Sequence, residues 1–411
     1  MPENDTREPA RHSIRHFSGL GTMQRAVSLG STLLALLAFV VMSGVALAQS
    51  PQAGAAGSAQ TKAVAGSGGE EAWRTGLNTN TISIIAGHPS ETYLEVVHDL
   101  AVVLNSENLR ILPVSGMGGA QNIRDVLHLK GIDAGITSTH MLRYFASTGG
   151  LGPTLDQRVN YVAKLFVEEM HVVVGTAIKS VDDLAGKKVN FSDLGSTTQI
   201  TARDVFGLLS IPVQEVNMNQ ADAITRIKSG EIAGTVLFSG KPVRLLSGLS
   251  SSDGLRLLTI PFTPTLENTY VPAELEADVY PNLIPKGQTV QTIGVDAVLI
   301  TMNWPRTSER YRRIAAFVEA FFSKFPELRR EPRHPKWQQV NLAAELPGWD
   351  RFPAAQEWLD RAKRLEPAQA DFQQFLAARA QKRGTRALTE EAERKLFREF
   401  LKWSARQPQQ R

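Results

Sequence analysis

Two spacings of apolar residues alternate along residues 81–302, and they predict strands followed by helices. The run at 81–86 (TISIIA) is apolar and β-branched, whereas the apolar positions of 90–104 recur every three to four residues, as on one face of a helix. By the same criteria we expect strands at 109–114, 132–136, 189–191, 214–216, 234–238 and 290–302, and helices at 119–129, 196–209, 221–228 and 242–249. This order is typical of parallel βαβ units with right-handed crossovers.

The pattern changes between residues 158 and 175, where VNYVAKLF and MHVVVG predict two strands in near succession. Glu168 and Glu169 lie between these runs, and we interpret this carboxylate pair as solvent-exposed charge. His171, inside an apolar strand, is interpreted as a core residue with satisfied hydrogen bonds. We expect two α/β lobes with strand crossings near 170–178 and 285–298. The expected boundaries are 77–174 with 290–330 for lobe 1, and 175–289 for lobe 2.

Charged helical sequence dominates beyond Trp304. An amphipathic pattern predicts a helix at 308–325, a second helix is expected at 367–383, and Thr389 can cap a third whose first turn is acidic. Residues 331–411 are therefore assigned to a basic C-terminal helical extension. We interpret it as helices that pack on the lobes and expose a basic face. The alternative is contact with a membrane subunit or with anionic lipid headgroups.

The N-terminal segment has the pattern of an export signal. Residues 26–48 carry no charge, their apolar centre is about ten residues long, Arg25 precedes them, and Ala46-Leu47-Ala48 forms an A-x-A cleavage site. We expect a signal peptide at 1–48, with Met23 as an alternative start and an uncleaved anchor as the alternative fate. The Gly-, Ala-, Ser- and Gln-rich residues 49–76 are expected to form a disordered linker.

Composition removes several kinds of chemistry. The 411 residues include no cysteine, which excludes disulfides, thiolate nucleophiles and cysteine-ligated zinc or iron–sulfur sites. The eight histidines show no metal-ligand spacing, and no nucleophile–base–orienter set is recognisable. The formal net charge of +4 comes from the basic residues 306–411, so it does not argue for nucleic acid as a partner. We therefore expect binding without catalytic residues, metal or cofactor.

Short polar loops, four of which contain glycine, follow five of the predicted strands and precede helices. Helix N-termini expose unpaired N–H groups and carry partial positive charge, so these loops can bind an anion without bulk positive charge. Open α/β sheets place ligands at such strand ends. The alternative for any single loop is simple helix capping. The loops comprise residues 87–90, 115–119, 137–140, 195–198 and 239–242.

Several of these motifs, taken in order, resemble the TAXI family, the TRAP-associated extracytoplasmic solute-binding proteins. The resemblance covers roughly residues 80–325. Its most specific stretch is His171-Val172-Val173-Val174 followed by 178–189 (IKSVDDLAGKKV), which is shared broadly with two-lobed binding proteins. The remaining matches are the strand–Gly–helix opening at 84–93, the loop at 118–123, the acid–Gly motif at 131–136, the G-S-G-T-like loop at 195–198 and the segment at 223–234.

The resemblance implies an α/β type II periplasmic-binding-protein fold, with two lobes that close on a solute by a hinge, followed here by the C-terminal extension. It implies a periplasmic receptor that delivers a small organic anion, most plausibly a carboxylate, to the membrane subunits of a TRAP-type transporter. Residues 196–198 and Lys241 would bind the anionic group, and Tyr93 and Asn122 would orient the ligand. The full expected ligand-binding set is His88, Ser90, Tyr93, Gly118, Gly119, Asn122, Ser138, Thr139, Gly195, Ser196, Thr197, Thr198, Ser239 and Lys241.

Three positions depart from the family pattern. Gly119 replaces the serine of the first glycine loop, Thr197 stands at the third position of the G-S-G-T loop, and Thr139-His140 ends the third loop where a polar–acidic pair is usual. These changes alter the donors and the volume available to a ligand. Two other functions stay open at this point: a receptor for an ABC-type importer of sulfonates or oxyanions or for a sensor kinase, and an enzyme on the same two-lobed fold.

Overall fold

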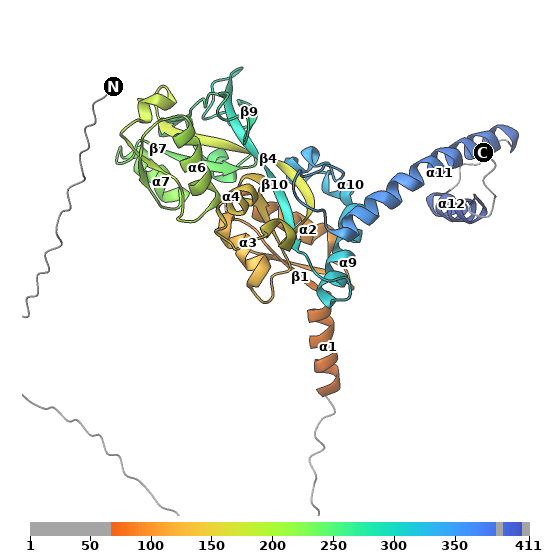
Figure 1. The fold of residues 1–411 in the computed structure, drawn as a ribbon. Coiled ribbons are helices and arrows are strands. Elements are labelled where there is room, and N and C mark those ends of the chain that lie inside the picture. Colours follow the sequence, from red (N-terminus) through yellow and green to blue (C-terminus); the bar gives the residue numbers. More distant parts are fainter. Residues whose placement is uncertain (1–66, 90, 384–388, 405–411) are drawn as a thin grey trace, which may run out of the picture. The chain divides into compact units, whose positions relative to one another are not determined.

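The computed structural model describes residues 67–89, 91–383 and 389–404 (Figure 1). The expected signal peptide, its cleavage site and linker residues 49–66 lie outside the described residues. The linker prediction was wrong for 67–76, which belong to helix α1 (Ser67–Asn80). An i,i+4 ion pair between Arg74 and Glu70 (3.0 Å) supports this exposed helix. Within the described ranges, no helix combines the length and apolar character needed to cross a membrane.

The first half of the fold alternates strands and helices as the sequence predicts. Ser138 begins α4 by accepting a hydrogen bond from the Met141 backbone N–H (3.3 Å). The third strand lies two residues later than expected. The elements are β1 (Thr81–Ile85), α2 (Thr92–Leu104), β2 (Arg110–Val114), α3 (Gly119–His128), β3 (Ala134–Ser138), α4 (Thr139–Thr148), α5 (Leu155–Arg158) and β4 (Val159–Gly175).

The second half continues the alternation with shorter elements. Ser196 and Asn219 cap α6 and α7 through their side-chain oxygens. The helix expected at 242–249 is only one turn long. The elements are η1 (Val181–Leu184), β5 (Lys188–Asn190), α6 (Thr197–Leu208), β6 (Gln214–Val216), α7 (Gln220–Lys228), β7 (Gly234–Ser239), α8 (Arg244–Ser247), η2 (Ser251–Asp253), β8 (Leu255–Leu257), β9 (Val271–Glu276) and β10 (Thr289–Met302).

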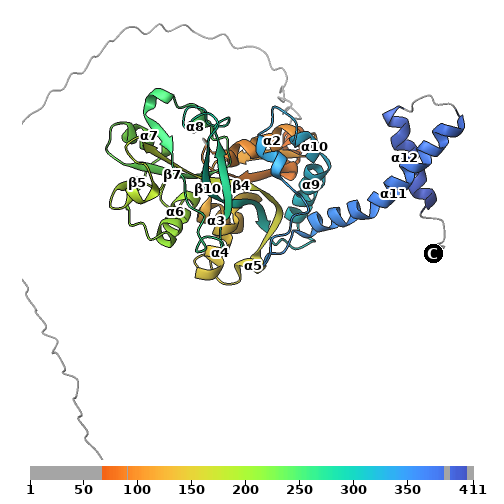
Figure 2. The same cartoon turned by 90° about the horizontal axis from the view of Figure 1, so that it is seen from above.

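In the described part of the chain, ten strands form one sheet with the order β2-β1-β3-β10-β4-β7-β5-β6, while β8 pairs with β4 and β9 with β10. The β1–β2, β1–β3, β5–β6 and β5–β7 pairs are parallel. Strands β4 and β10 run antiparallel to their neighbours between these two parallel groups (Figure 2). We call the β2-β1-β3 side with its helices lobe 1, and the β7-β5-β6 side with its helices lobe 2.

The two expected strands at 158–175 are one 17-residue strand, β4. Its first part pairs with β10, and at Glu169 the pairing passes to β7, opposite Ser239. Glu168 and Glu169 therefore lie at the crossing between the lobes, where they are 2% and 3% exposed. The expectation of a solvent-exposed carboxylate pair was wrong, because both faces of the sheet are covered at this point.

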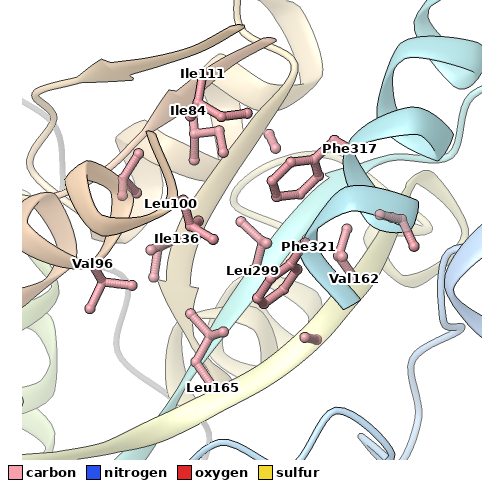
Figure 3. Close-up of a cluster of buried hydrophobic side chains, with 14 of the residues drawn as sticks. Ile84, Val96, Leu100, Ile111, Ile136, Val162, Leu165, Leu299, Phe317 and Phe321 are labelled. Atoms are coloured by element: carbon pink, nitrogen blue, oxygen red, sulfur yellow. The ribbon is translucent and has the colours of Figure 1, made fainter. Parts of the chain in front are cut away.

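Each lobe buries apolar side chains on both faces of its part of the sheet. In lobe 1, one cluster joins α2 and α9 to β1 and β10, with Phe317 and Phe321 at its centre (Figure 3). A second cluster joins α3 and α4 to the opposite face. Lobe 2 has two further clusters, one around α6 and one around α7. Because each lobe has its own core, each is a separate packing unit.

The C-terminal region packs on lobe 1 before it extends. It comprises α9 (Glu309–Ser323), α10 (Phe325–Leu328), η3 (Pro335–Gln339), α11 (Pro353–Arg383) and α12 (Glu390–Ser404). The predicted start at Pro367 was wrong, since α11 begins at Pro353 and continues through Pro367. Farther along α11, Phe372 is buried, with ring centroids 5.0 Å from Phe397 and 5.3 Å from Phe400 of α12. This tertiary packing helps to offset the cost of a proline inside a helix.

Candidate functional site

The glycine loops of the two lobes meet directly. The Gly119 backbone N–H, at the start of α3 in lobe 1, donates to Oγ1 of Thr197 at the start of α6 in lobe 2 (2.5 Å). A Cβ on Gly119 would lie 2.8 Å from the Gly195 carbonyl oxygen, and one on Gly118 would lie 2.5 Å from Thr197 Oγ1. Both lobe 1 glycines have positive φ, +67° at Gly118 and +50° at Gly119. A serine in place of Gly119 would collide with lobe 2 backbone, so this close approach of the two loops requires glycine.

A second contact between the lobes joins the start of α2 to the loop after β7. The Thr92 backbone N–H donates to Ser239 Oγ (3.2 Å), and the Thr92 hydroxyl donates to the Gly240 carbonyl. Ser239 belongs to the expected set, whereas Thr92 and Gly240 do not. The available signal was that Thr92 lies two residues after the polar loop at 87–90, but capping within one lobe explained a threonine at this position equally well.

Four expected residues make hydrogen bonds inside their own lobe. The Asn122 amide donates to the carbonyls of Ala86 and Ile136 (2.8 Å each) and so ties α3 to the ends of β1 and β3. Ser138 and Ser196 cap α4 and α6, which is the helix-capping alternative given above for these loops. Thr198 Oγ1 accepts from the Phe238 backbone N–H (3.1 Å).

The remaining residues of the expected ligand-binding set lie in different environments. His88 is exposed, Thr139 is buried at the start of α4, Gly195 has φ of +78°, and Ser90 lies outside the described residues. Lys241, the expected anion-binding cation, is paired with a carboxylate in this structure. Its Nζ contacts both carboxylate oxygens of Glu276 (2.6 and 2.7 Å) and donates to the Glu274 carbonyl. A role of Lys241 in ligand binding stays a prediction, and it would require this ion pair to be exchanged.

The sequence reading missed a group of carboxyls beside the meeting point of the lobes. Tyr93, from the expected set, donates through its hydroxyl to Glu168 Oε2 (2.6 Å). Burial, together with the charges of Glu91 and Glu169, raises the pKa of Glu168 well above its usual range. Burial, with Asp193 of lobe 2 nearby, raises the pKa of Glu91 to about 7. Glu168 and Glu169 interrupt an otherwise apolar β run, but charge in a strand ordinarily predicts exposure, so the sequence held no signal of their burial.

On β4, Glu169 joins three parts of the fold. One carboxylate oxygen accepts from Nζ of Lys336, a fully buried side chain of η3, and the other accepts from the Lys241 backbone N–H (3.0 Å). Burial raises the pKa of Glu169, and the Lys336 charge opposes that shift. The C-terminal region thus reaches the crossing strand, a contact between segments far apart in sequence.

His171 has the structural role expected for it. Its two ring nitrogens lie 2.9 Å from the Glu169 carbonyl and 2.9 Å from the Tyr280 hydroxyl. Burial lowers its pKa to about 3, so the imidazole is neutral. Among the described residues no group of three or more His, Asp or Glu side chains is arranged to hold a metal ion.

Three surface cavities lie away from these loops. One of about 660 Å³ in lobe 2 is lined by residues that include Gly175, Lys188 and Ala233, at the ends of β5 and β7 opposite the ligand loops. Two others, of about 500 and 380 Å³, border α1, β2 and α9. The candidate site is therefore the boundary between the lobes, which is closed by direct contacts in this structure.

Residues 84–348, more than half of the chain, match the model of the NMT1-like family. This chain belongs to the NMT1-like family. The match spans both lobes and the segment that packs η3 against β4. In this NMT1-like chain, two α/β lobes are joined by the long strands β4 and β10. This is the type II periplasmic-binding-protein fold.

Solved structures with a similar fold are distant in sequence. The putative periplasmic sulfonate-binding protein SsuA from Methylobacillus flagellatus KT is 14% identical with a TM-score of 0.38, over 61% of this chain and 70% of that chain. The amino acid ABC transporter substrate-binding protein AbpA from Streptococcus pneumoniae is 14% identical with a TM-score of 0.37, over 69% of this chain and 98% of that chain. YhfZ from Shigella flexneri is 14% identical with a TM-score of 0.37, over 65% and 98%.

Proposed function

We propose that this NMT1-like chain is a periplasmic solute receptor that binds a small organic anion, a carboxylate, between its lobes. It hands this solute to the membrane subunits of a TRAP-type secondary transporter and catalyses no reaction on it. The observation that carries the proposal is the meeting of the two lobes at helix N-termini: the start of α3 contacts the start of α6 through Gly119–Thr197, and the start of α2 contacts the loop after β7 through Thr92–Ser239. Helix N-termini favour an anion through free N–H groups and the helix dipole.

The carboxyls beside this site fit an anionic ligand when they are neutral. Glu168 has a strongly raised pKa, and Glu91 is half protonated near pH 7. A protonated carboxyl can donate a hydrogen bond to a carboxylate, whereas an ionised one repels it. Binding of the anion is therefore expected to strengthen as Glu91 becomes protonated.

Support for the transporter type comes from the sequence motifs that resemble the TAXI family. Support for export comes from the pattern of residues 26–48. The transporter type and the export of the receptor are both tested by measuring uptake of the solute. The cells used produce the receptor and its neighbouring permease. A TRAP-type partner predicts uptake that collapses with the ion gradients, whereas uptake that survives their loss and requires ATP would contradict it.

The ligand class is tested by calorimetry and thermal melting with mono- and dicarboxylates, a sulfonate and the matching neutral amides. We expect carboxylates to bind and to raise the melting temperature. Thr197→Val should weaken binding about tenfold, the usual effect of losing one hydrogen bond. Thr225→Val, on the exposed side of α7, is the matched control and should leave affinity unchanged. Binding of an amide without binding of its carboxylate would overturn the anion proposal.

A further inference from the structure

A segment of lobe 2 between β8 and β9 contacts helix α4 of lobe 1. We call this segment, residues 263–270, the strap. The Arg143 guanidinium on α4 donates to the backbone carbonyls of Asn268 (3.5 Å) and Thr269 (2.9 Å) in the strap. Helix α4 also lies beside α6 of lobe 2 (Figures 1 and 2). The two lobes therefore meet at α4 as well as at the candidate loops.

The strap is fixed to the core of lobe 2. Its side chains Leu266 and Tyr270 are buried in the apolar cluster around α6. The Tyr270 backbone N–H donates to the Leu266 carbonyl (2.9 Å), which closes a turn. The Tyr270 hydroxyl donates to Oδ2 of Asp204 on α6 (2.6 Å). A movement of the strap must therefore involve α6, whose N-terminus carries the loop at 195–198.

His140, one turn before Arg143 on α4, forms the buried part of the same contact. Its ring centroid lies 5.6 Å from that of Tyr270, and the residue is 5% exposed. Its Nδ1 lies 3.1 Å from Thr201 Oγ1 and its Nε2 lies 3.3 Å from Asp204 Oδ2, both on α6. A neutral imidazole satisfies both partners, because Nδ1 accepts from the hydroxyl and Nε2–H donates to the carboxylate. Arg143 thus occupies the exposed edge of a contact whose centre excludes water.

Arg143 and the strap lie outside the five candidate loops, so their effect on a solute must pass through the position of the lobes. The hydrogen bonds of Arg143 to the strap are lost when the lobes separate. Water then solvates the guanidinium and the carbonyls, so the net stabilisation of the closed arrangement is modest. For a charged donor with two acceptors near the surface, we expect the equilibrium between closed and open lobes to shift about tenfold.

We propose that Arg143 is a positioning residue for solute retention. By seating the strap on α4, it holds lobe 2 closed over a solute that it does not touch. Release requires this contact to open, so the contact lowers the dissociation rate, the step in which related complexes mostly differ. Solute retention rests on the proposed function, whereas closure by Arg143 does not, because closure is measured without solute. The two can therefore fail separately.

The absence of cysteine from the chain allows a direct measurement of closure. Glu107→Cys in lobe 1 and Ser229→Cys in lobe 2 are exposed positions that belong to neither α4 nor the strap, and they take a fluorescent donor and acceptor in the full chain. Single-molecule energy transfer at one fixed pH gives the closed-to-open ratio. Arg143→Gln should lower this ratio about tenfold. Arg143→Lys, which can still donate to one carbonyl, should give a ratio between those of Arg143→Gln and the parent.

Tyr270→Phe is a second variant that acts on the same contact. It keeps the ring and removes the hydrogen bond that ties the strap to α6, so it should lower the ratio about threefold. Arg312→Gln is the matched control, since this lobe 1 arginine on α9 is 69% exposed, and the ratio should stay unchanged. An unchanged ratio in both Arg143→Gln and Tyr270→Phe, a parent fixed in one arrangement, or an equal fall in Arg312→Gln would overturn closure by Arg143.

Retention is measured by stopped flow with the compound that binds most tightly in calorimetry. Arg143→Gln should raise its dissociation rate about tenfold without slowing association, and Arg312→Gln should change neither rate. A lower closed-to-open ratio with an unchanged dissociation rate would overturn retention. Slower association with unchanged dissociation would also contradict it, because a contact that forms after the solute has entered acts on release.

Discussion

At the residue scale, the feature with the largest consequence is the burial of carboxyls where the lobes meet. Glu91, Glu168 and Glu169 come from two elements and are held by Tyr93, Lys336 and backbone N–H groups. Burying a carboxylate without full compensation raises its pKa and costs folding free energy. The molecule therefore maintains groups that would be more stable in water, as sites that bind ligands commonly do.

The raised pKa of Glu91 predicts the direction in which the free energy of unfolding changes with pH. Its folded pKa of about 7 lies above its ordinary value of 4.5, so the folded state holds a proton that the unfolded state releases, and the free energy of unfolding falls as pH rises between these values. Glu91→Gln removes this loss. At pH 8 the variant should be more stable than the wild type by about 3 kcal/mol, and at pH 4 the two should be nearly equal.

Denaturant unfolding across this pH range checks the prediction. Glu107→Gln, at an exposed position of lobe 1, is the control and should follow the wild type at every pH. Equal behaviour of the Glu91 and Glu107 variants at pH 8 would show that Glu91 is solvated in solution.

At the element scale, η3 and β4 form a contact that neither could provide alone. Lys336 extends from a short helix of the C-terminal region to Glu169 on the crossing strand, and its aliphatic stem limits the space at Gly240, where a Cβ would lie 3.1 Å from Lys336 Cε. The loop after β7 is therefore held between the C-terminal region and α2. The alkyl stem packs while the ammonium is neutralised, as for other buried lysines with a carboxylate partner.

Lys336→Met removes the charge and keeps the volume, so one carboxylate oxygen of the buried Glu169 loses its ammonium partner while the other keeps the Lys241 backbone N–H. We expect a loss of about 3–5 kcal/mol in the free energy of unfolding, and recovery of much of it when Glu169→Gln is added. Lys164→Met is the matched control on the same strand, since the Lys164–Asp296 pair is partly exposed and should contribute less than about 1 kcal/mol. A similar loss for Lys336→Met and Lys164→Met would contradict the assignment.

At the scale of the whole molecule, closure depends on how closely two backbones approach. The three atoms nearest to a Cβ added at Gly119 are backbone atoms of Gly195, Ser196 and Thr197. No flexible side chain can therefore move aside for the methyl group, and a substitution there acts on the separation of the lobes. Because β4 and β10 are the strands that pass between the lobes, a small obstruction at the loops becomes a rotation about those strands.

Gly119→Ala should therefore shift the protein toward the open arrangement by at least tenfold. Energy transfer between labels at Ser147→Cys in lobe 1 and Ser229→Cys in lobe 2, or an increase in the radius of gyration, measures the shift. Gly195→Ala is the control, because Gly195 shares the positive φ (+78°) but a Cβ there would meet no atom within 4 Å. Backbone strain alone would change both variants equally, and that result would contradict a steric role for Gly119.

The sequence by itself determined the succession of strands and helices. Local spacing of apolar residues and capping by Ser138, Ser196 and Asn219 are properties of short segments, and the structure confirms most elements to within a few residues. Prediction from the sequence failed at two places: Pro367 lies inside α11, and residues 67–76 are helical. It also divided β4 in two at Glu168 and Glu169, because charge in a strand predicts exposure unless a partner such as Lys336 is known.

Only the tertiary structure decided the site. The sequence located the candidate loops, but whether a serine or threonine caps its own helix or contacts the other lobe depends on a few ångströms of separation between segments about 80 residues or more apart. Thus Thr197 and Ser239 contact lobe 1, Ser138 and Ser196 cap helices, and Lys241 pairs with Glu276. Local patterns fix elements because the interactions are local, whereas the site consists of pairings that exist only when the two lobes are brought together.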